Sequence, residues 1–143
     1  SAASDVYKRQ GDEDSMNQVV RISKENGVSI GAHPSFKDLE NFGRKRINLS
    51  SSEIKKLIID QYEILQKIAQ NHGESVTHMK PHGALNNMAC EDLELASILA
   101  KTINDIDISI SLIVLAKMDA NSKSSHAMLF NAPCGFICVT LSP

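Results

Sequence analysis

The sequence predicts an α/β fold in which parallel strands alternate with helices. Stretches with helical apolar periodicity alternate with short apolar runs, an order that implies β-α-β units with right-handed crossovers. The run at residues 110–116 is apolar on both faces, as expected of a central parallel strand. Two further runs each lead into a histidine beside a proline, at His33 and His82, so both expected strands end in chemically active side chains.

The composition is ordinary for a globular chain of 143 residues, with 42% hydrophobic and 22% charged residues. A net charge of −2 gives no reason to expect nucleic acid or a membrane surface as a partner, and no apolar run is long enough to cross a bilayer. The three cysteines argue against a disulfide scaffold and favour a reducing cytoplasm. Cys134 and Cys138 are a weak zinc signal, because structural zinc normally takes four ligands.

The first half of the chain shows one weak and one strong helix. A helix opens near Asp12 and ends before Gly27, followed by a short buried strand at residues 28–32. The second helix begins after Ser50, which forms a capping-box pattern with Glu53, and its apolar periodicity continues to Gly73. This second helix is the best supported element of the sequence.

The second half repeats the alternation. A strand at residues 76–79 ends at Pro81, a helix is expected from about Asp92 to Asn104, and the third strand covers residues 110–116. Three strands cannot close a barrel, so they form either an open sheet or an arc cut from a larger barrel.

The two histidine motifs define the expected site. The carboxyl ends of parallel strands meet at one edge of a sheet, where α/β proteins bind ligands, so we expect His33 and His82 to line one crevice. Metal ligation, acid–base work and hydrogen bonding to a substrate all remain open for them. A single histidine there is more often a cap for loop backbone groups, but two at matching positions beside Lys80 favour a site. Lys80 would stabilise an anion, a phosphate or a developing oxyanion.

Residues 33–44 form a long expected loop with two phenylalanines, a composition that favours an ordered and functional loop. Within it, Asp38 either orients a histidine or binds a substrate amine, and Arg44 clamps a carboxylate; alternatively, the two pair with each other and brace the loop.

Asparagine and aspartate side chains complete the candidate set. Asn86 and Asn87 either bind a ligand or cap the next helix, with capping favoured for Asn87. Asp12 is either a helix cap or part of a catalytic segment.

The chain has no phosphate-binding P-loop, no dinucleotide fingerprint, no zinc-protease motif and no nucleophile elbow. These residues therefore indicate a small-molecule site on a β/α scaffold without naming a reaction.

Three motifs in order resemble the LamB/YcsF family, which supplies the A subunit of the ATP-dependent 5-oxoprolinase of bacteria. They are IGAHPSFKDL at residues 30–39, FGRK at residues 42–45 and MKPHGALNN at residues 79–87. Gln61 and the DLELA segment at residues 92–96 match later pieces of the family pattern. The resemblance covers about residues 11–116.

The chain departs from the family pattern at both ends and at internal positions. The family's N-terminal strand and the histidine of its first motif are missing, Asn86 stands where the family has a tyrosine, and residues 117–119 stand where it has a Gly-Ser turn. Residues 1–10 look like a translated library adaptor, residues 11–121 are expected to form a partial barrel domain, and residues 122–143 are expected to be a divergent tail. We therefore expect an incomplete fragment of a seven-stranded β/α barrel.

The resemblance implies a cytoplasmic enzyme that opens the lactam of 5-oxoproline to L-glutamate, with ATP as co-substrate and subunits B and C as partners. Lys80, His82 and His33 would be catalytic, and Asp38, Arg44, Asn87 and Asp12 would bind substrate. An alternative of the same fold is a metal-dependent amide hydrolase or deacetylase in which His33 and His82 ligate a divalent metal. A further alternative is a non-catalytic module that binds a small carboxylate.

Overall fold

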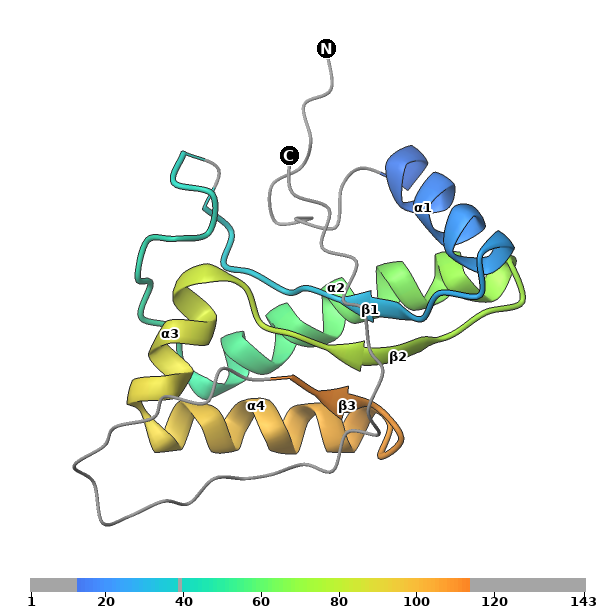
Figure 1. Cartoon of the computed structure of the whole chain (residues 1–143). Helices are drawn as coiled ribbons and strands as arrows, with labels where there is room; N and C mark the ends of the chain where they lie inside the picture. The colour runs from blue at the N-terminus through green and yellow to red at the C-terminus, as the bar shows by residue number, and fades with distance from the viewer. Residues whose placement is uncertain (1–12, 39, 114–143) are drawn as a thin grey trace, which may run out of the picture.

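The computed structural model of the chain describes residues 13–38 and 40–113 (Figure 1). The segments expected to be non-native or divergent, residues 1–10 and 122–143, lie outside these residues. The described elements follow one another in this order: α1 (Glu13–Glu25), β1 (Ile30–Ala32), α2 (Ser51–Asn71), β2 (Val76–Met79), α3 (Gly83–Glu91), α4 (Leu93–Ile106) and β3 (Ser111–Leu112).

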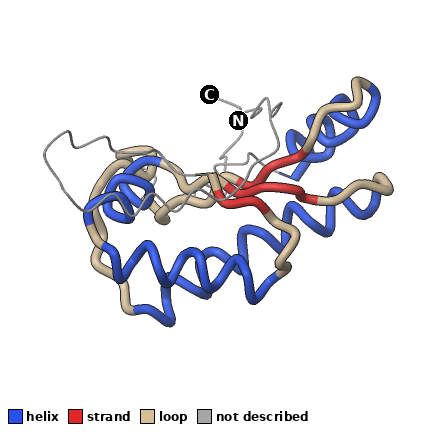
Figure 2. The backbone as a smooth tube through the Cα atoms, turned by 60° about the horizontal axis from the view of Figure 1, so that its bottom comes forward, coloured by secondary structure: helices blue, strands red, loops and turns tan. Residues whose placement is uncertain are grey.

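The three described strands form one parallel sheet in the order β1-β2-β3, which confirms the predicted parallel topology (Figure 2). They are shorter than expected: β1 begins at Ile30 rather than residue 28, and β3 is Ser111–Leu112, with residues 114–116 outside the described part of the chain. A seven-stranded barrel remains a prediction, because the described strands are three of the expected seven.

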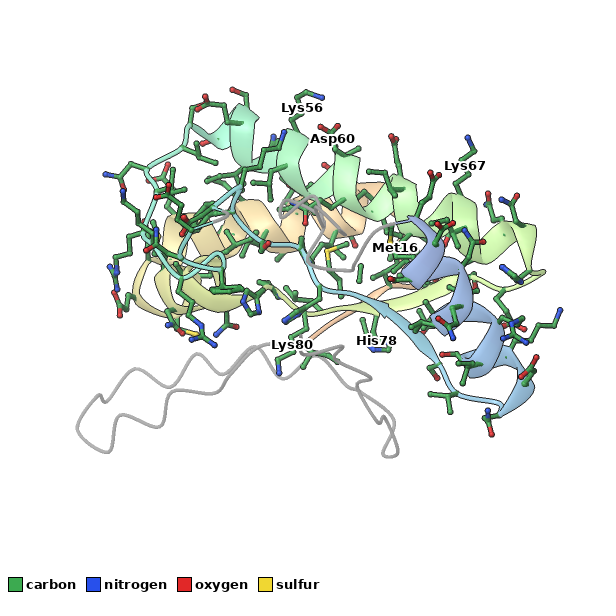
Figure 3. The ribbon with its side chains drawn as sticks, turned by 90° about the horizontal axis from the view of Figure 1, so that it is seen from above. Met16, Lys56, Asp60, Lys67, His78 and Lys80 are labelled. Carbon is green, nitrogen blue, oxygen red and sulfur yellow. The ribbon has the colours of Figure 1, made fainter. Side chains whose placement is uncertain are left out.

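An irregularity in β2 determines which of its side chains face the helices. Ile30 pairs with Val76 but Gly31 pairs with His78, so β2 contains one extra residue, Thr77, at this point. Val76 and Met79 are therefore both buried in the core, and His78 points to the opposite face of the sheet (Figure 3).

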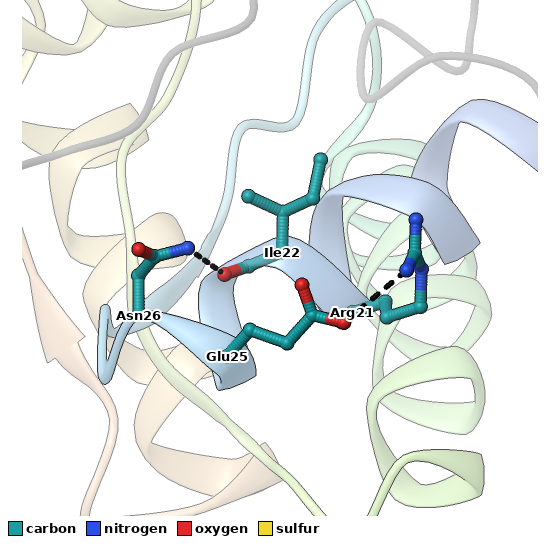
Figure 4. Close-up of polar contacts among 4 residues, drawn as sticks. All are labelled: Arg21, Ile22, Glu25 and Asn26. Atoms are coloured by element: carbon teal, nitrogen blue, oxygen red, sulfur yellow. Dashed lines mark hydrogen bonds and ion pairs between the residues drawn. The ribbon is translucent and has the colours of Figure 1, made fainter.

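Helix α1 packs against α2 and buries Met16 and Val20, while Ile22 is exposed. Its last turn is held by local polar contacts (Figure 4). Arg21 Nη1 lies 3.2 Å from Glu25 Oε1, and Asn26 Nδ2 donates to the carbonyl of Ile22 at 2.8 Å. Such exposed contacts add only tenths of a kcal/mol each, so packing against α2 is the main support of this helix.

Helix α2 confirms the predicted capping box. The Ser50 hydroxyl accepts from the Glu53 backbone N–H, and the Glu53 carboxylate accepts from the Ser50 backbone N–H at 2.8 Å. Beyond the helix, Gly73 adopts a φ of +74°, the left-handed conformation that glycine allows at a helix end. The buried face of α2 contacts β1, β2 and α4, which makes this helix the centre of the described core.

The sequence prediction missed helix α3. No helix was predicted for residues 83–91, which include a glycine and two asparagines, all weak helix formers. Tertiary contacts compensate for this weak propensity: Ala84 and Leu85 are buried, the Ala84 N–H donates to the Gly43 carbonyl at 3.0 Å, and Arg46 forms an ion pair with Glu91.

Helix α4 begins where the sequence predicted and ends two residues later than expected. Asp92 caps it, because its Oδ1 accepts from the N–H groups of Glu94 at 2.9 Å and Leu95 at 3.3 Å. Its apolar side packs on α2 and α3. Among the described residues, no helix combines the length and apolar character needed to cross a membrane.

Candidate functional site

The parallel pairing of β1 and β2 brings the two histidine motifs together. Backbone hydrogen bonds continue this pairing beyond both strand ends: the Lys80 N–H donates to the Ala32 carbonyl, and the His82 N–H donates to the Pro34 carbonyl, both at 2.9 Å. The segment after β1 therefore runs alongside the segment after β2. This backbone arrangement places the side chains of His33 and His82 next to each other, as the strand-end argument expected.

The two imidazoles are in direct contact. His33 Nε2 lies 2.7 Å from His82 Nδ1, and the ring centroids are 4.7 Å apart at an interplanar angle of 76°. The outer ring nitrogens lie next to backbone carbonyls. His33 Nδ1 is 2.6 Å from the carbonyl oxygen of Lys80, and His82 Nε2 is 3.1 Å from that of Phe42. We call these two residues the histidine pair; both side chains are half-buried.

The loop that follows β1 is fixed to the start of α3 by a close backbone approach. Phe42 and Gly43 have φ values of +56° and +68°, and the Gly43 carbonyl accepts from the Ala84 N–H. A Cβ at Gly83 would lie 2.6 Å from the Gly43 carbonyl oxygen, and Gly83 itself has a φ of +52°. Both facts require glycine at position 83. Phe42 is strained for a residue with a Cβ, and such strain often accompanies functional loops.

Lys80 leaves β2 on the face of the sheet opposite α2, the same side as His78 (Figure 3). The Lys80 residue is half-buried, and among the described residues its ammonium group has no ion-pair partner. The backbone of Lys80 is fixed at the end of a strand, and no neighbouring described side chain neutralises its charge. Such a lysine is suited to binding an anionic ligand.

Asp38 braces its own loop. Its Oδ1 accepts from the side chain of Asn41 at 2.9 Å, and its Oδ2 accepts from the backbone N–H of Lys45 at 3.1 Å. The hydrogen bond from Asn41 is the largest cause and lowers the pKa of Asp38; burial, the next largest, opposes it, and the Lys45 N–H lowers the pKa further. The alternative of an Asp38–Arg44 pair is not observed, and the bracing is done by Asn41 and Lys45 instead.

The remaining candidates have different outcomes. The Arg44 side chain is exposed beside Gly83, in reach of the same edge of the sheet. Asn87 lies within α3, exposed, so the idea that it caps the next helix is wrong because Asp92 does so. Asp12 lies outside the described residues. Substrate binding by Arg44, Asn87 and Asp38 stays a prediction.

Gln61 supports the site from α2, a role that the sequence reasoning missed. Its Nε2 donates to the Ser35 carbonyl at 2.8 Å, and its Oε1 accepts from the Ser35 N–H at 3.1 Å. The side-chain amide thus pairs with both backbone groups of a fully buried residue, as a neighbouring strand would. Its sequence signal was a polar residue within the apolar face of α2.

His78 is also buried, with a side chain that lies directly on Gly31. A Cβ at Gly31 would be 2.1 Å from His78 Nε2, so glycine at this position makes room for the ring. Burial lowers the pKa of His78, because the charged imidazolium is disfavoured away from water.

Asn86, an internal departure from the family pattern, is buried in α3. Asn86 is 5% exposed, and its Oδ1 has no hydrogen-bond partner among the described residues. Its Nδ2 lies 3.5 Å from Asn87 Oδ1. Asn86 therefore does not cap a helix, and its buried oxygen is an unsatisfied acceptor where the family pattern has a tyrosine.

The histidine pair as arranged does not fit a metal ion shared by both rings. Two nitrogen ligands at about 2.0–2.1 Å from a tetrahedral zinc would be separated by more than 3 Å, roughly 3.4 Å. The facing nitrogens are 2.7 Å apart, and the outer nitrogens lie against carbonyls. Within the described segments, no group of three or more potential ligands is positioned to hold a metal. A metal requirement stays a prediction without support from this geometry.

Comparison with known proteins identifies the family. The family model described as "LamB/YcsF family" matches residues 8–137. The chain belongs to the LamB/YcsF family.

Relatives of this LamB/YcsF chain are found among curated proteins and solved structures. The chain is 40% identical over 122 residues to the A subunit of 5-oxoprolinase from Staphylococcus aureus strain MRSA252, covering 85% of this chain and 49% of that protein. The strain Newman protein of the same name is 39% identical over the same length. The lactam utilization protein of Thermus thermophilus superposes with a TM-score of 0.71 at 36% identity, covering 75% of this chain and 43% of the other. The chain therefore spans about half the length of the curated relatives it matches.

Proposed function

We propose that the chain is part of the A subunit of an ATP-dependent 5-oxoprolinase, which opens the lactam of 5-oxoproline to L-glutamate together with subunits B and C. The observation that carries this proposal is that the shared motifs converge. His33, from the first motif, and Lys80 and His82, from the last, meet at one edge of the sheet. The similarity to proteins named as the A subunit of 5-oxoprolinase covers the same segments of the chain.

The chemistry explains why such a site would need a cation and a proton. A lactam carbonyl is a poor electrophile, and transfer of the γ-phosphoryl group of ATP to its oxygen makes it reactive. Water then adds to the carbonyl carbon, the C–N bond breaks with a proton delivered to the nitrogen, and a second water releases phosphate from the resulting acyl phosphate. The overall balance is 5-oxoproline, ATP and two waters to glutamate, ADP and phosphate.

We assign the two tasks to neighbouring groups. The Lys80 ammonium would neutralise charge on the transferred phosphoryl group, and His82, with His33, would move the proton. Asp38 and Arg44 belong to the loop that borders the pair, where Arg44 would reach the substrate carboxylate.

The test is ATP-dependent glutamate formation from 5-oxoproline by the chain, produced with any flanking sequence its gene encodes and mixed with subunits B and C. Lys80→Met should lower kcat about 100-fold or more, the effect of removing one preorganised charge-stabilising group. Lys67→Met is the matched control, because Lys67 is exposed on α2, far from Lys80 (Figure 3).

Three results would overturn these assignments. Full activity in His82→Ala would remove the histidine from the chemistry. If a 5-oxoproline complex forms without any turnover of ATP, the carboxylate-binding module would be favoured. If a chelator abolishes turnover and a divalent metal other than the magnesium of ATP restores it, the amide hydrolase would be favoured.

A further inference from the structure

The outer nitrogens of the histidine pair fix two protons. A backbone carbonyl oxygen can only accept a hydrogen bond, so each ring nitrogen beside one must donate. His33 Nδ1 lies 2.6 Å from the Lys80 carbonyl oxygen, and His82 Nε2 lies 3.1 Å from the Phe42 carbonyl oxygen. Each imidazole therefore holds one proton on its outer nitrogen.

The contact between the rings requires a third proton. If both imidazoles were neutral, the remaining nitrogens, His33 Nε2 and His82 Nδ1, would direct two lone pairs at each other over 2.7 Å. With one additional proton, the same contact becomes a hydrogen bond from an imidazolium to an imidazole. Its short length agrees with that assignment, because hydrogen bonds from charged donors are shorter than neutral ones.

We infer that the histidine pair holds three protons on its four ring nitrogens, carries one positive charge and enters the reaction as a proton donor. The donor role rests on the proposed function, whereas the proton count rests on the three contacts alone. The pair would then supply the proton that the lactam nitrogen needs when the C–N bond breaks. A base that removes a proton from water would have to be another group.

Some groups around the histidine pair favour its positive charge and others disfavour it. The two carbonyl dipoles at its ends favour the positive charge, while the N-terminus of α3, where His82 is the N-cap residue, disfavours it. The ionisable side chains described in the loop between β1 and α2 are Lys37, Asp38, Glu40, Arg44, Lys45 and Arg46, and Lys80 lies at the end of β2. Asp38 and Glu40 are the acidic residues in this set; the Asp38 carboxylate is already bound by Asn41 and Lys45, and Glu40 is exposed to solvent.

Nitrogen-15 NMR of histidine-labelled protein tests the count, because protonated and unprotonated ring nitrogens give separate signals. The sample is the ligand-free chain with any flanking sequence its gene encodes. At about pH 7.5, one unit above the ordinary histidine pKa, three of the four nitrogens of the pair should be protonated. His82→Gln, which keeps a donor for the Phe42 carbonyl, should leave His33 with a single proton. His72→Gln should leave the count at three, because His72 contacts Asn17 instead.

Two protons across the pair at this pH would overturn the inference, as would a second proton that persists on His33 in His82→Gln. If that variant does not fold, the wild-type spectrum alone decides. The NMR count and lactam turnover are separate measurements. Three protons without any turnover would refute the proposed function and leave the proton count standing, whereas turnover with two protons would refute only the inference.

Discussion

The amide of Gln61 is the best place to test how the helix layer holds the site. Gln61→Met keeps the length and much of the volume of the side chain but removes both hydrogen bonds to Ser35. Ser35 is fully buried, so its N–H and carbonyl would lose their partners without gaining water. Each unsatisfied buried group costs about 1–3 kcal/mol, so the free energy of unfolding should fall by about 2–5 kcal/mol.

Helix α2 offers two matched controls for the same substitution. Gln66 Oε1 accepts one hydrogen bond, from the Val76 N–H at 2.8 Å, so Gln66→Met should cost about half as much as Gln61→Met. Gln70 is exposed near the end of the helix, so Gln70→Met should change stability by less than about 0.5 kcal/mol. The expected order of destabilisation is Gln61, Gln66, Gln70.

Urea unfolding of the chain with its native flanking sequence measures these differences, provided that the slope against denaturant stays constant. A loss of about 3 kcal/mol would lower the midpoint by about 1 M or more at slopes of roughly 1–3 kcal/mol per M. The reasoning fails if Gln61→Met is no more destabilising than Gln70→Met. If Gln61 matters for positioning, Gln61→Met should also reduce turnover more than Gln66→Met.

Three further predictions concern a cap and two titrating groups. Asp92→Ala should cost about 0.5–2 kcal/mol in urea unfolding, because two N–H groups of α4 lose their acceptor, and Asp92→Asn should recover most of it. The lowered pKa of His78 means that wild-type stability should fall as pH drops below about 6.5, the unfolded value, and His78→Gln should remove that part of the decline. The lowered pKa of Asp38 gives stability that is present above about pH 3.9 and lost as pH falls through the folded value, so Asp38→Asn should cost stability at neutral pH and little near pH 2.

Each of these has a contradicting result. Equal stabilities of Asp92→Ala and wild type would mean that the cap is replaced by water. An unchanged acid decline in His78→Gln would place the titrating group elsewhere, and a constant stability difference for Asp38→Asn from neutral to acid pH would show that its hydrogen bonds do not depend on the carboxylate charge.

Local patterns in the sequence determined the elements whose signals are carried by a few neighbouring residues. The capping box at Ser50 and Glu53, the glycine at the end of α2 and the start of α4 at Asp92 are all found as expected. Each of these depends on backbone conformation or on side chains that bond their own backbone within three residues, so spacing alone is sufficient information. The parallel pairing of β1 and β2 followed from the helix between them.

Helix α3 and the partners of the site were decided by contacts across long sequence separations. Residues 83–91 are weak helix formers, but they adopt a helix because the Ala84 N–H bonds the Gly43 carbonyl and the helix packs against α4. Gln61 reaches Ser35, 26 residues away, from a different layer. Within one loop, Asp38 bonds Asn41 and Lys45 rather than Arg44, because the path of the loop backbone brings those groups to its carboxylate. Such choices depend on where the backbone of one segment lies relative to another, which a linear pattern does not contain.

The histidine pair shows both kinds of information. The sequence by itself placed His33 and His82 at the ends of two parallel strands, and that was enough to expect one site. Only the tertiary structure set their facing ring nitrogens 2.7 Å apart, with a carbonyl at each outer nitrogen. The physical reason is that residue type and spacing fix which edge of the sheet a side chain occupies, while the number of protons it holds depends on the individual atoms it faces.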